Sequence, residues 1–347
     1  MAKKKKSWKE RQRERLIRMQ RAKESYEIQK ERERAKAPKT RHRLKWMLGA
    51  LCIIVLIACV FGIGQYMNSV STPKENPSQE TGENTENESG IAYTFIYINS
   101  NGTVSPSTAP IVKEGTARYK FTLDVYGAIF VEKDNIEIDG AGHTLLGKGE
   151  DVGIYIYLKN NITIKNLKIT GFQYGIFLNS ASQNVILKNE ISSNYYGVWL
   201  TNSSNNNNVV ENNVTGNQLG IYLDLSQSNT ISSNLIAGNN KGISLYEASK
   251  NIITGNTFSE NSSGITLGES DNNQIFHNNF MYNIIQAYAE NSTNSWDDGV
   301  SFGNYWYDYQ AKYPEAEEVD NSGIWNIPYE ISDGNQDRYP RVKPFTP

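Results

Sequence analysis

Aromatic residues recur at one position of a repeated motif, and their spacing could create a binding surface. The third position of the motif Gly-Ile-x-Leu and its close variants is occupied in turn by Tyr155, Phe177, Trp199, Tyr222, Ser244, Thr266 and Tyr288. If the Ile and the Leu point inward, the residue between them points outward. Aromatic faces exposed in a row suit the apolar faces of sugar rings, and a contiguous apolar patch often marks a binding site.

Two more tyrosines enlarge this candidate surface, because Tyr174 and Tyr196 directly precede two of the glycines. The predicted carbohydrate-binding residues are therefore Tyr155, Phe177, Trp199, Tyr222, Tyr174 and Tyr196. Two alternatives to a binding role stay open at this point. Aromatic residues have a high propensity for strands whatever their function, and a terminal segment of the chain could cover them.

Three carboxylates follow the same motif in consecutive repeats and are the candidates for catalysis. Asp224, Glu247 and Glu269 are expected at neighbouring corners of the fold. Glycoside hydrolysis uses two carboxyl groups about 5 to 10 Å apart, so an enzyme would need such a pair here. The simpler interpretation is that they are solvated turn residues. Asp139 and His143 form another conceivable pair, although Asp is common at Gly-rich corners.

The aromatic motif belongs to a repeat of 22 or 23 residues. Its glycines are Gly153, Gly175, Gly197, Gly220, Gly242 and Gly264, and the position recurs at Gln286. Apolar and polar residues alternate within each repeat, which is typical of short strands rather than helices. Three strands per repeat describe one coil of a parallel β-helix, whose coils stack at roughly 4.8 Å. The predicted fold is all-β: a right-handed parallel β-helix, or solenoid, with about 22 residues per coil.

Three columns of asparagine separate the predicted strands. They begin at Asn184, Asn189 and Asn194 and recur in each later repeat up to Asn283. Asparagine tolerates the left-handed backbone of a sharp corner and can bond its own backbone there. We therefore expect these asparagines at the corners of the coil. Because a coil cannot bury its apolar face alone, both ends of the solenoid need caps.

The charge and hydropathy of the first 90 residues differ from those of the rest. Residues 1–45 hold 19 Lys or Arg and 6 Glu, a net charge of +13, whereas the remainder has a net charge of −15. Residues 46–63 are almost continuously apolar and would span about 27 Å as a helix. A cleaved signal peptide is the alternative, but the long basic region before it favours an uncleaved anchor. Both cysteines, Cys52 and Cys59, lie in this segment.

These features predict a single-pass membrane protein with a cytoplasmic N-terminus and an external β-helix. The expected organisation is a basic cytoplasmic arm at 1–45, a transmembrane helix at 46–66 and a disordered tether at 67–90. The N-terminal cap and first coils follow at 91–152, the repeats at 153–293 and the C-terminal cap at 294–347. The arm is expected to contact anionic lipid head groups. We expect no nucleic-acid partner, because nothing in the arm reads bases.

Specific motifs mark both ends of the predicted solenoid. The first is the stretch 96–145, with Asn101-Gly102-Thr103-Val104 and the corner Asp139-Gly140-Ala141-Gly142-His143. The closing motifs include Trp296-Asp297-Asp298-Gly299 and Asp337-Arg338-Tyr339-Pro340. These motifs and the repeats between them resemble the NosD-like proteins. The resemblance covers about residues 93–347 and implies a right-handed β-helix of the carbohydrate-binding and sugar-hydrolase type, common on archaeal cell surfaces.

The resemblance also raises two questions about metals. The name NosD implies copper, which prefers soft or imidazole ligands, but His277 and Met281 have no third partner nearby in the sequence. The family's closing segment suggests calcium, for which Asp297, Asp298 and Asp308 could supply oxygens. We predict no metal site and no cofactor.

The function predicted from these observations is that of a membrane-anchored extracellular protein that binds or scaffolds cell-surface polysaccharide without catalysis. The first alternative is a polysaccharide-modifying enzyme, either a hydrolase, a lyase or an epimerase. A copper-binding or copper-delivery protein is the second alternative.

Overall fold

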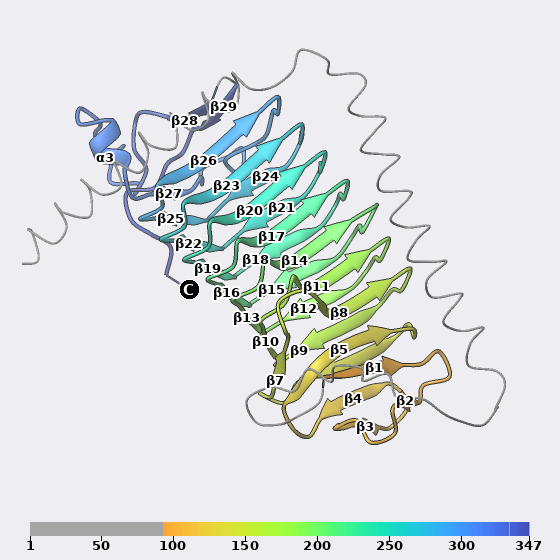
Figure 1. Cartoon of the computed structure of the whole chain (residues 1–347). Coiled ribbons are helices and arrows are strands. Elements are labelled where there is room, and N and C mark those ends of the chain that lie inside the picture. Colours follow the sequence, from red (N-terminus) through yellow and green to blue (C-terminus); the bar gives the residue numbers. More distant parts are fainter. Residues whose placement is uncertain (1–92, 333, 347) are drawn as a thin grey trace, which may run out of the picture. The chain divides into compact units, whose positions relative to one another are not determined.

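The computed structural model describes residues 93–332 and 334–346, which form a parallel β-helix (Figure 1). Each central coil contributes one strand to each of three parallel sheets, so the predicted all-β solenoid is confirmed. The basic arm, the tether and the transmembrane helix expected at 46–66 lie outside the described residues. Among the residues that are described, no helix has the length and apolar character needed to cross a membrane.

The strands of the first sheet are the longest and carry the aromatic motif. They are β1 (Thr94–Ile98), β5 (Val125–Val131), β8 (Val152–Tyr157), β11 (Tyr174–Asn179), β14 (Tyr196–Thr201), β17 (Leu219–Asp224), β20 (Lys241–Tyr246), β23 (Ser263–Gly268) and β26 (Ile285–Glu290). Equivalent residues pair in parallel 22 or 23 positions apart, as Phe177 does with Trp199 and Trp199 with Tyr222. The repeat length read from the sequence is therefore the length of one coil.

The second sheet has nine strands and the third has mostly three-residue strands. The second comprises β3 (Ile111–Glu114), β4 (Arg118–Phe121), β6 (Ile136–Asp139), β9 (Ile162–Lys165), β12 (Val185–Leu187), β15 (Asn208–Val210), β18 (Thr230–Ser232), β21 (Ile252–Thr254) and β24 (Gln274–Phe276). The third comprises β7 (Thr144–Leu146), β10 (Lys168–Thr170), β13 (Glu190–Ser192), β16 (Asn213–Thr215), β19 (Leu235–Ala237), β22 (Thr257–Ser259), β25 (Asn279–Met281) and β27 (Tyr305–Trp306). β5 pairs with both β7 and β8 and so joins the first and third sheets.

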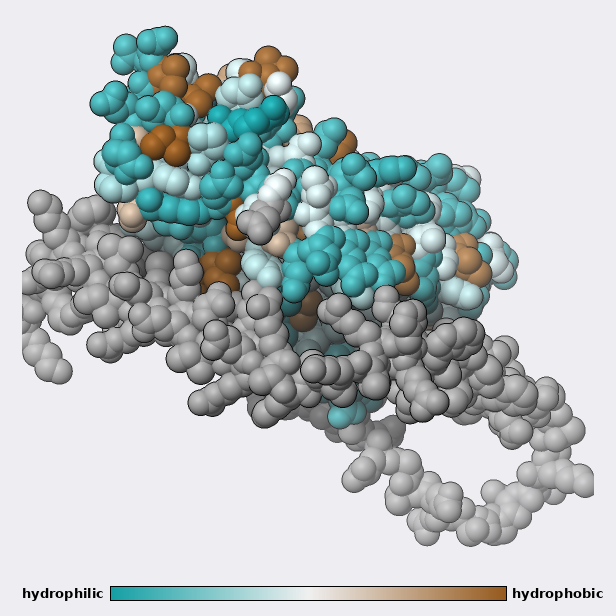
Figure 2. All heavy atoms as spheres, turned by 90° about the horizontal axis from the view of Figure 1, so that it is seen from above, coloured by the Kyte–Doolittle hydropathy of each residue, from teal (hydrophilic) through white to brown (hydrophobic). Residues whose placement is uncertain are grey.

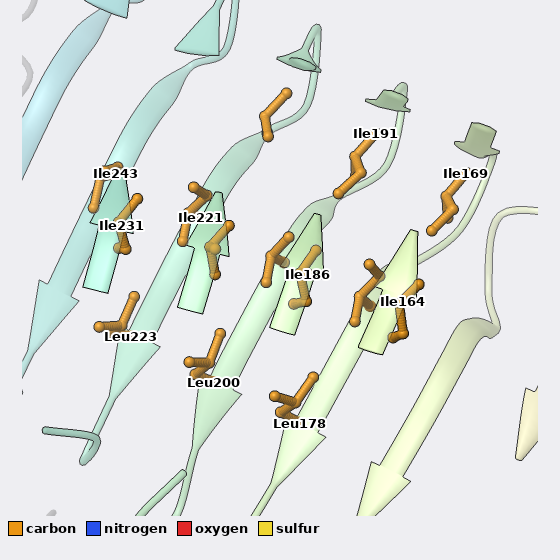
Figure 3. Close-up of a cluster of buried hydrophobic side chains, with 14 of the residues drawn as sticks. Ile164, Ile169, Leu178, Ile186, Ile191, Leu200, Ile221, Leu223, Ile231 and Ile243 are labelled. Carbon is orange, nitrogen blue, oxygen red and sulfur yellow. The ribbon is translucent and has the colours of Figure 1, made fainter. Parts of the chain in front are cut away.

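The core is a set of vertical columns of aliphatic side chains. Leu178, Leu200 and Leu223 lie one above another on the first sheet (Figure 3), and all three are fully buried. Burying one such side chain contributes roughly 1.5 to 3 kcal/mol, and neighbouring coils share each contact. On the outside, hydrophilic side chains cover most of the visible described surface, with hydrophobic ones in small separate patches (Figure 2).

The side chains of the asparagine columns are buried inside the coil. The prediction that these asparagines have left-handed backbone is wrong. The backbone N–H and the side-chain amide of Asn189 both donate to Oδ1 of Asn212, at 2.9 and 3.0 Å. The residue with left-handed backbone is the one before each asparagine, such as Lys188 with φ 53°. The asparagine is needed because its amide satisfies the buried N–H and C=O groups that a turn leaves unpaired.

Separate segments cover the two ends of the solenoid. At the first end, β3 and β4 form an antiparallel pair and β2 (Val104–Ser105) pairs with β1. At the other end lie α3 (Tyr309–Lys312), β28 (Tyr329–Ser332) and β29 (Asn335–Asp337). The Trp306 ring stacks on Phe280 of the last coil at 4.4 Å and on Tyr329 at 4.1 Å. The C-terminal segment therefore continues the core stack.

Candidate functional site

The structure brings the six predicted carbohydrate-binding residues together on the outward face of the first sheet. Tyr155, Phe177, Trp199 and Tyr222 pair in register on β8, β11, β14 and β17. Their ring centroids are 5.2, 4.7 and 5.9 Å apart in that order. Tyr174 and Tyr196 stack beside them at 5.4 Å. The aromatic surface is continuous across these four coils because their equivalent residues pair in register.

Sequence reasoning missed two further members of this row. Tyr97 of β1 pairs with Phe130 of β5, and Phe130 pairs with Tyr155. Neither follows a Gly-Ile pair, which is why the motif did not reveal them. Each is an aromatic residue between two buried aliphatic residues, as in Ile96-Tyr97-Ile98, and this pattern could have identified both in the sequence. The ring column is defined as Tyr97, Phe130, Tyr155, Phe177, Trp199 and Tyr222, one ring from each of six successive coils.

The rings of the column cover one another's faces, and this changes how a ligand could meet them. Phe177 and Trp199 are nearly parallel, with 11° between their planes, and Trp199 and Tyr222 differ by 25°. Stacked rings in a vertical column present their edges outward, so sugar rings cannot stack on the inner members. Phe130 meets Tyr155 edge-on at 83°, which breaks the stack. The indole N–H of Trp199 has no hydrogen-bond acceptor among the described residues.

The ring column ends at Tyr222, where the catalytic candidates begin. The next two positions hold Ser244 and Thr266, and Thr266 Oγ1 lies 3.1 Å from Ser244 Oγ. Asp224 is the last residue of β17, two positions after Tyr222, and it accepts a hydrogen bond from Thr201 Oγ1 at 3.0 Å. Burial raises the pKa of Asp224 above its ordinary value, and the nearby charge of Glu247 adds to the rise.

Glu247 and Glu269 occupy equivalent exposed corners of two neighbouring coils, with left-handed backbone at φ 47° and 51°. Asp224 does not belong to this column, because it pairs with Tyr246 rather than with Glu247. Asp224 was predicted to lie at the corner equivalent to Glu247 and Glu269. Leu225 occupies that corner instead, and Asp224 lies one residue before it.

Tyrosine hydroxyls and carboxylates share this end of the ring column. Burial raises the pKa of Tyr222, and Asp224 is the next largest cause. Burial also raises the pKa of Tyr246, with further contributions from Glu269 and Glu247. The three carboxylates therefore act electrostatically on the two tyrosines. Asp224, Glu247 and Glu269 are called the carboxylate group below.

A pocket of about 410 Å³ that is open to solvent lies at the corner beside this group. It is lined by Asn202, Ser203, Leu225, Ser226, Gln227, Glu247 and Ser249. Its volume is within the range of small-molecule sites, about 300 to 1,000 Å³. Glu247 thus faces a space that could receive one unit of a larger ligand.

The structure does not bring Asp139 and His143 together as an acid and base. Asp139 accepts hydrogen bonds from Arg118 at 2.6 Å and from the Ala141 N–H at 2.9 Å. Burial alone would raise the pKa of Asp139, but these bonds lower it below its usual value. The Nδ1 atom of His143 is 3.2 Å from Asp124 instead. Each residue has a structural partner of its own.

His277, one of the two residues considered for copper, packs among aromatic rings. His277 lies against the rings of Phe276, Phe302 and Phe345 at 5.0 to 5.4 Å. Burial lowers the pKa of His277. Within residues 93–332 and 334–346, no group of three His, Cys, Asp or Glu side chains could hold a metal ion. Among the described residues, His277 therefore has no pair of further imidazole, thiol or carboxylate groups beside it with which to hold a copper ion.

The aspartates considered for calcium also have protein partners. Asp297 accepts two hydrogen bonds from the Arg338 guanidinium, at 2.6 and 2.9 Å. Asp298 Oδ1 accepts backbone N–H bonds from the three residues 300–302. Asp308 accepts from the Tyr329 hydroxyl at 3.1 Å. These carboxylates stabilise the C-terminal segment.

The fold and its outward aromatic column define a parallel β-helix protein with a candidate binding face. The chain belongs to the NosD family, whose model, described as periplasmic copper-binding protein (NosD), matches residues 134–311. This confirms the resemblance seen in the sequence. A search of curated proteins finds no match.

Several solved structures are similar to this chain at low identity. The periplasmic alginate epimerase AlgG is 23% identical with a TM-score of 0.39, covering 48% of this chain and 39% of its own. Pectate lyase Pel9A is 15% identical with a TM-score of 0.37, covering 75% of each chain. ORF18 of Geobacillus virus E2 is 12% identical with a TM-score of 0.37, covering 71% of this chain and 58% of its own. The chain thus spans about two fifths of the epimerase.

Proposed function

We propose that the outward face of the first sheet binds cell-surface polysaccharide and that the protein holds it without catalysis. The observation that carries this proposal is the ring column, which places aromatic side chains on six successive coils. A repeated surface of this kind suits a ligand that is itself a repeating chain. The membrane anchor expected at 46–66 would keep the β-helix at the cell surface.

The geometry of the rings indicates how the polysaccharide is held. Ring edges recur along the face at the spacing of the coils, roughly 4.8 Å, and the tyrosines among them add hydroxyls. A glycan chain lying along the helix axis would contact several coils at once, and hydroxyls would donate to or accept from its oxygens. A long glycan chain would make many weak contacts at once, and together these give a high total affinity. A single sugar would make only one or two of them and would bind poorly.

A second candidate function is favoured by one specific observation, the raised pKa of Asp224 beside Glu247. A carboxyl group whose pKa is raised by burial can hold the proton that a general acid needs. In a hydrolase, Asp224 would donate a proton to the glycosidic oxygen while Glu247 acted as nucleophile or base. In a lyase or an epimerase, the ionised carboxylate would remove a proton from a sugar carbon.

One experiment separates the two functions. The protein is incubated with a panel of cell-surface and plant polysaccharides, and bound protein and released oligosaccharides are measured in the same tubes by mass spectrometry. Binding without products is the result that the proposal predicts. Released products would instead favour the enzyme, and substitution of Asp224 or Glu247 should then abolish them. If neither binding nor products are seen, the proposed function is wrong.

A further inference from the structure

The charges on the binding face are distributed unevenly along its strands. The strands of the first sheet contain only three charged residues, Asp224, Lys241 and Glu290. Asp224 and Glu290 are the last residues of their strands, and Glu247 and Glu269 directly follow the ends of β20 and β23. Four carboxylates of consecutive coils therefore lie along one edge of the face, next to the end of the ring column.

Lys241 does not neutralise this edge. It is the first residue of β20, five positions before Tyr246, so it lies roughly 16 Å from the carboxylate edge along the strand. This exceeds the distance of about 8 Å over which exposed charges act at physiological salt. Among the described residues, no ion pair joins Asp224, Glu247 or Glu269 to a basic side chain. Lys250, three positions after Glu247, is also exposed, but Asp224, Glu247 and Glu269 outnumber it, so this part of the edge carries net negative charge.

This charge discriminates between classes of polysaccharide. A polyuronate carries one carboxylate on each sugar and would meet like charges on successive coils, which is costly for association. A polymer of amino sugars with free amino groups carries positive charge at regular intervals. Its ammonium groups can pair with the carboxylates and lie against the rings of Tyr222 and Tyr246, where a cation is attracted to the ring.

We infer that the glycan held on this face is an amino-sugar polymer with free amino groups and that polyuronates are excluded. The inference rests on the proposed function, because it names the ligand of the same face. The ring column supplies the apolar contacts, and the carboxylate group selects the charge of the chain. The acids of the face thus serve specificity rather than catalysis.

The test compares three oligosaccharides of equal length binding to the full chain. Glucosamine oligomers, their N-acetylated counterparts and oligogalacturonates are titrated below the pKa of the amine, at low and at physiological salt. We expect glucosamine oligomers to bind about tenfold more tightly than the N-acetylated form, an advantage that salt reduces. We expect no binding of oligogalacturonate. Equal affinity for the first two, or tighter binding of oligogalacturonate, overturns the inference and leaves the proposed function intact.

Two variants with the same change in net charge show whether affinity depends on the carboxylate group itself or on the overall charge of the protein. The variant Asp224→Asn, Glu247→Gln, Glu269→Gln removes the carboxylate group. The control Glu190→Gln, Glu211→Gln, Glu260→Gln removes three exposed carboxylates from other parts of the coil. The first should lose about tenfold in affinity for glucosamine oligomers and the second less than twofold. Equal losses would mean that overall charge binds the ligand, which contradicts the inference. Failure of all three oligosaccharides to bind contradicts both proposals.

Discussion

At the residue scale, the glycine of the repeated motif is required by the distance between coils. A Cβ atom on Gly197 would lie 2.5 Å from the carbonyl oxygen of Gly220 in the next coil. The backbone oxygen cannot move away without breaking the parallel ladder. The motif therefore keeps glycine through six repeats, although its φ angle is not left-handed.

The variant Gly197→Ala should therefore destabilise the protein by about 1 to 3 kcal/mol, the usual cost of overpacking. Urea unfolding followed by circular dichroism measures the change. Gly268→Ala is the control, because its Cβ would lie 3.5 Å from the nearest atom, a Tyr246 ring carbon, which is an ordinary contact. A Gly197→Ala variant as stable as Gly268→Ala would show that neighbouring coils separate at little cost.

A buried carboxylate in the C-terminal segment gives the protein a pH-dependent stability. Asp337 accepts hydrogen bonds from the backbone N–H of Asn304, the Trp306 indole and the backbone N–H of Tyr339. Burial nevertheless raises the pKa of Asp337 to about 7. Because the folded pKa lies above the unfolded value of 3.8, its stability contribution is fully present below about pH 4 and is lost as the pH rises through about 7.

The melting temperature should therefore fall between about pH 4 and pH 7, by an amount that corresponds to at most about 4 kcal/mol in the free energy of unfolding. The variant Asp337→Asn removes the titrating group and should flatten this part of the profile. Scanning calorimetry at several pH values gives the comparison. An identical slope in both proteins would assign the pH dependence to another group.

At the element scale, the asparagine ladders connect the turns of successive coils. Asn234 Oδ1 accepts from the backbone N–H and the side-chain amide of Asn212, at 2.9 and 3.0 Å, and its own amide donates to the Val209 carbonyl at 2.8 Å. All of these residues are buried. Removing one asparagine leaves several polar groups without partners, each of which costs about 1 to 3 kcal/mol.

We predict that Asn234→Ala lowers the free energy of unfolding by about 3 kcal/mol or more. Asn240→Ala is the matched control, since Asn240 is an exposed asparagine of the same coil. Chemical denaturation of both variants measures the difference. Similar stabilities would indicate that water replaces the ladder bonds.

The parts of the fold that could be predicted from the sequence are those that depend on periodicity. The recurrence of Gly-Ile pairs revealed the coil length and the inward columns, because each coil must repeat the same contacts. Tyr97 and Phe130 were missed, because β1 and β5 precede the Gly-Ile motif. The ring orientation and the register of Asp224 could not be predicted either, since both depend on how neighbouring side chains pack at one corner.

At the scale of the whole molecule, the three sheets have different roles. The first sheet presents the ring column and the carboxylate edge, whereas the second and third sheets complete the buried core. Proteins of this fold present long flat faces because every coil adds one more copy of the same position. The proposed ligand, a glycan chain of repeating units, matches this repetition.

The most direct test of the central claim is the retention of the protein on the polysaccharide that binds best in the panel. Trp199 lies in the middle of the stacked rings, so Trp199→Ala should reduce retention at least fivefold, while the circular dichroism spectrum stays that of a β-helix. Leu235→Ala, which removes an exposed apolar side chain from the third sheet, should leave retention unchanged. Unchanged retention of Trp199→Ala would contradict the assignment of this face as the binding surface.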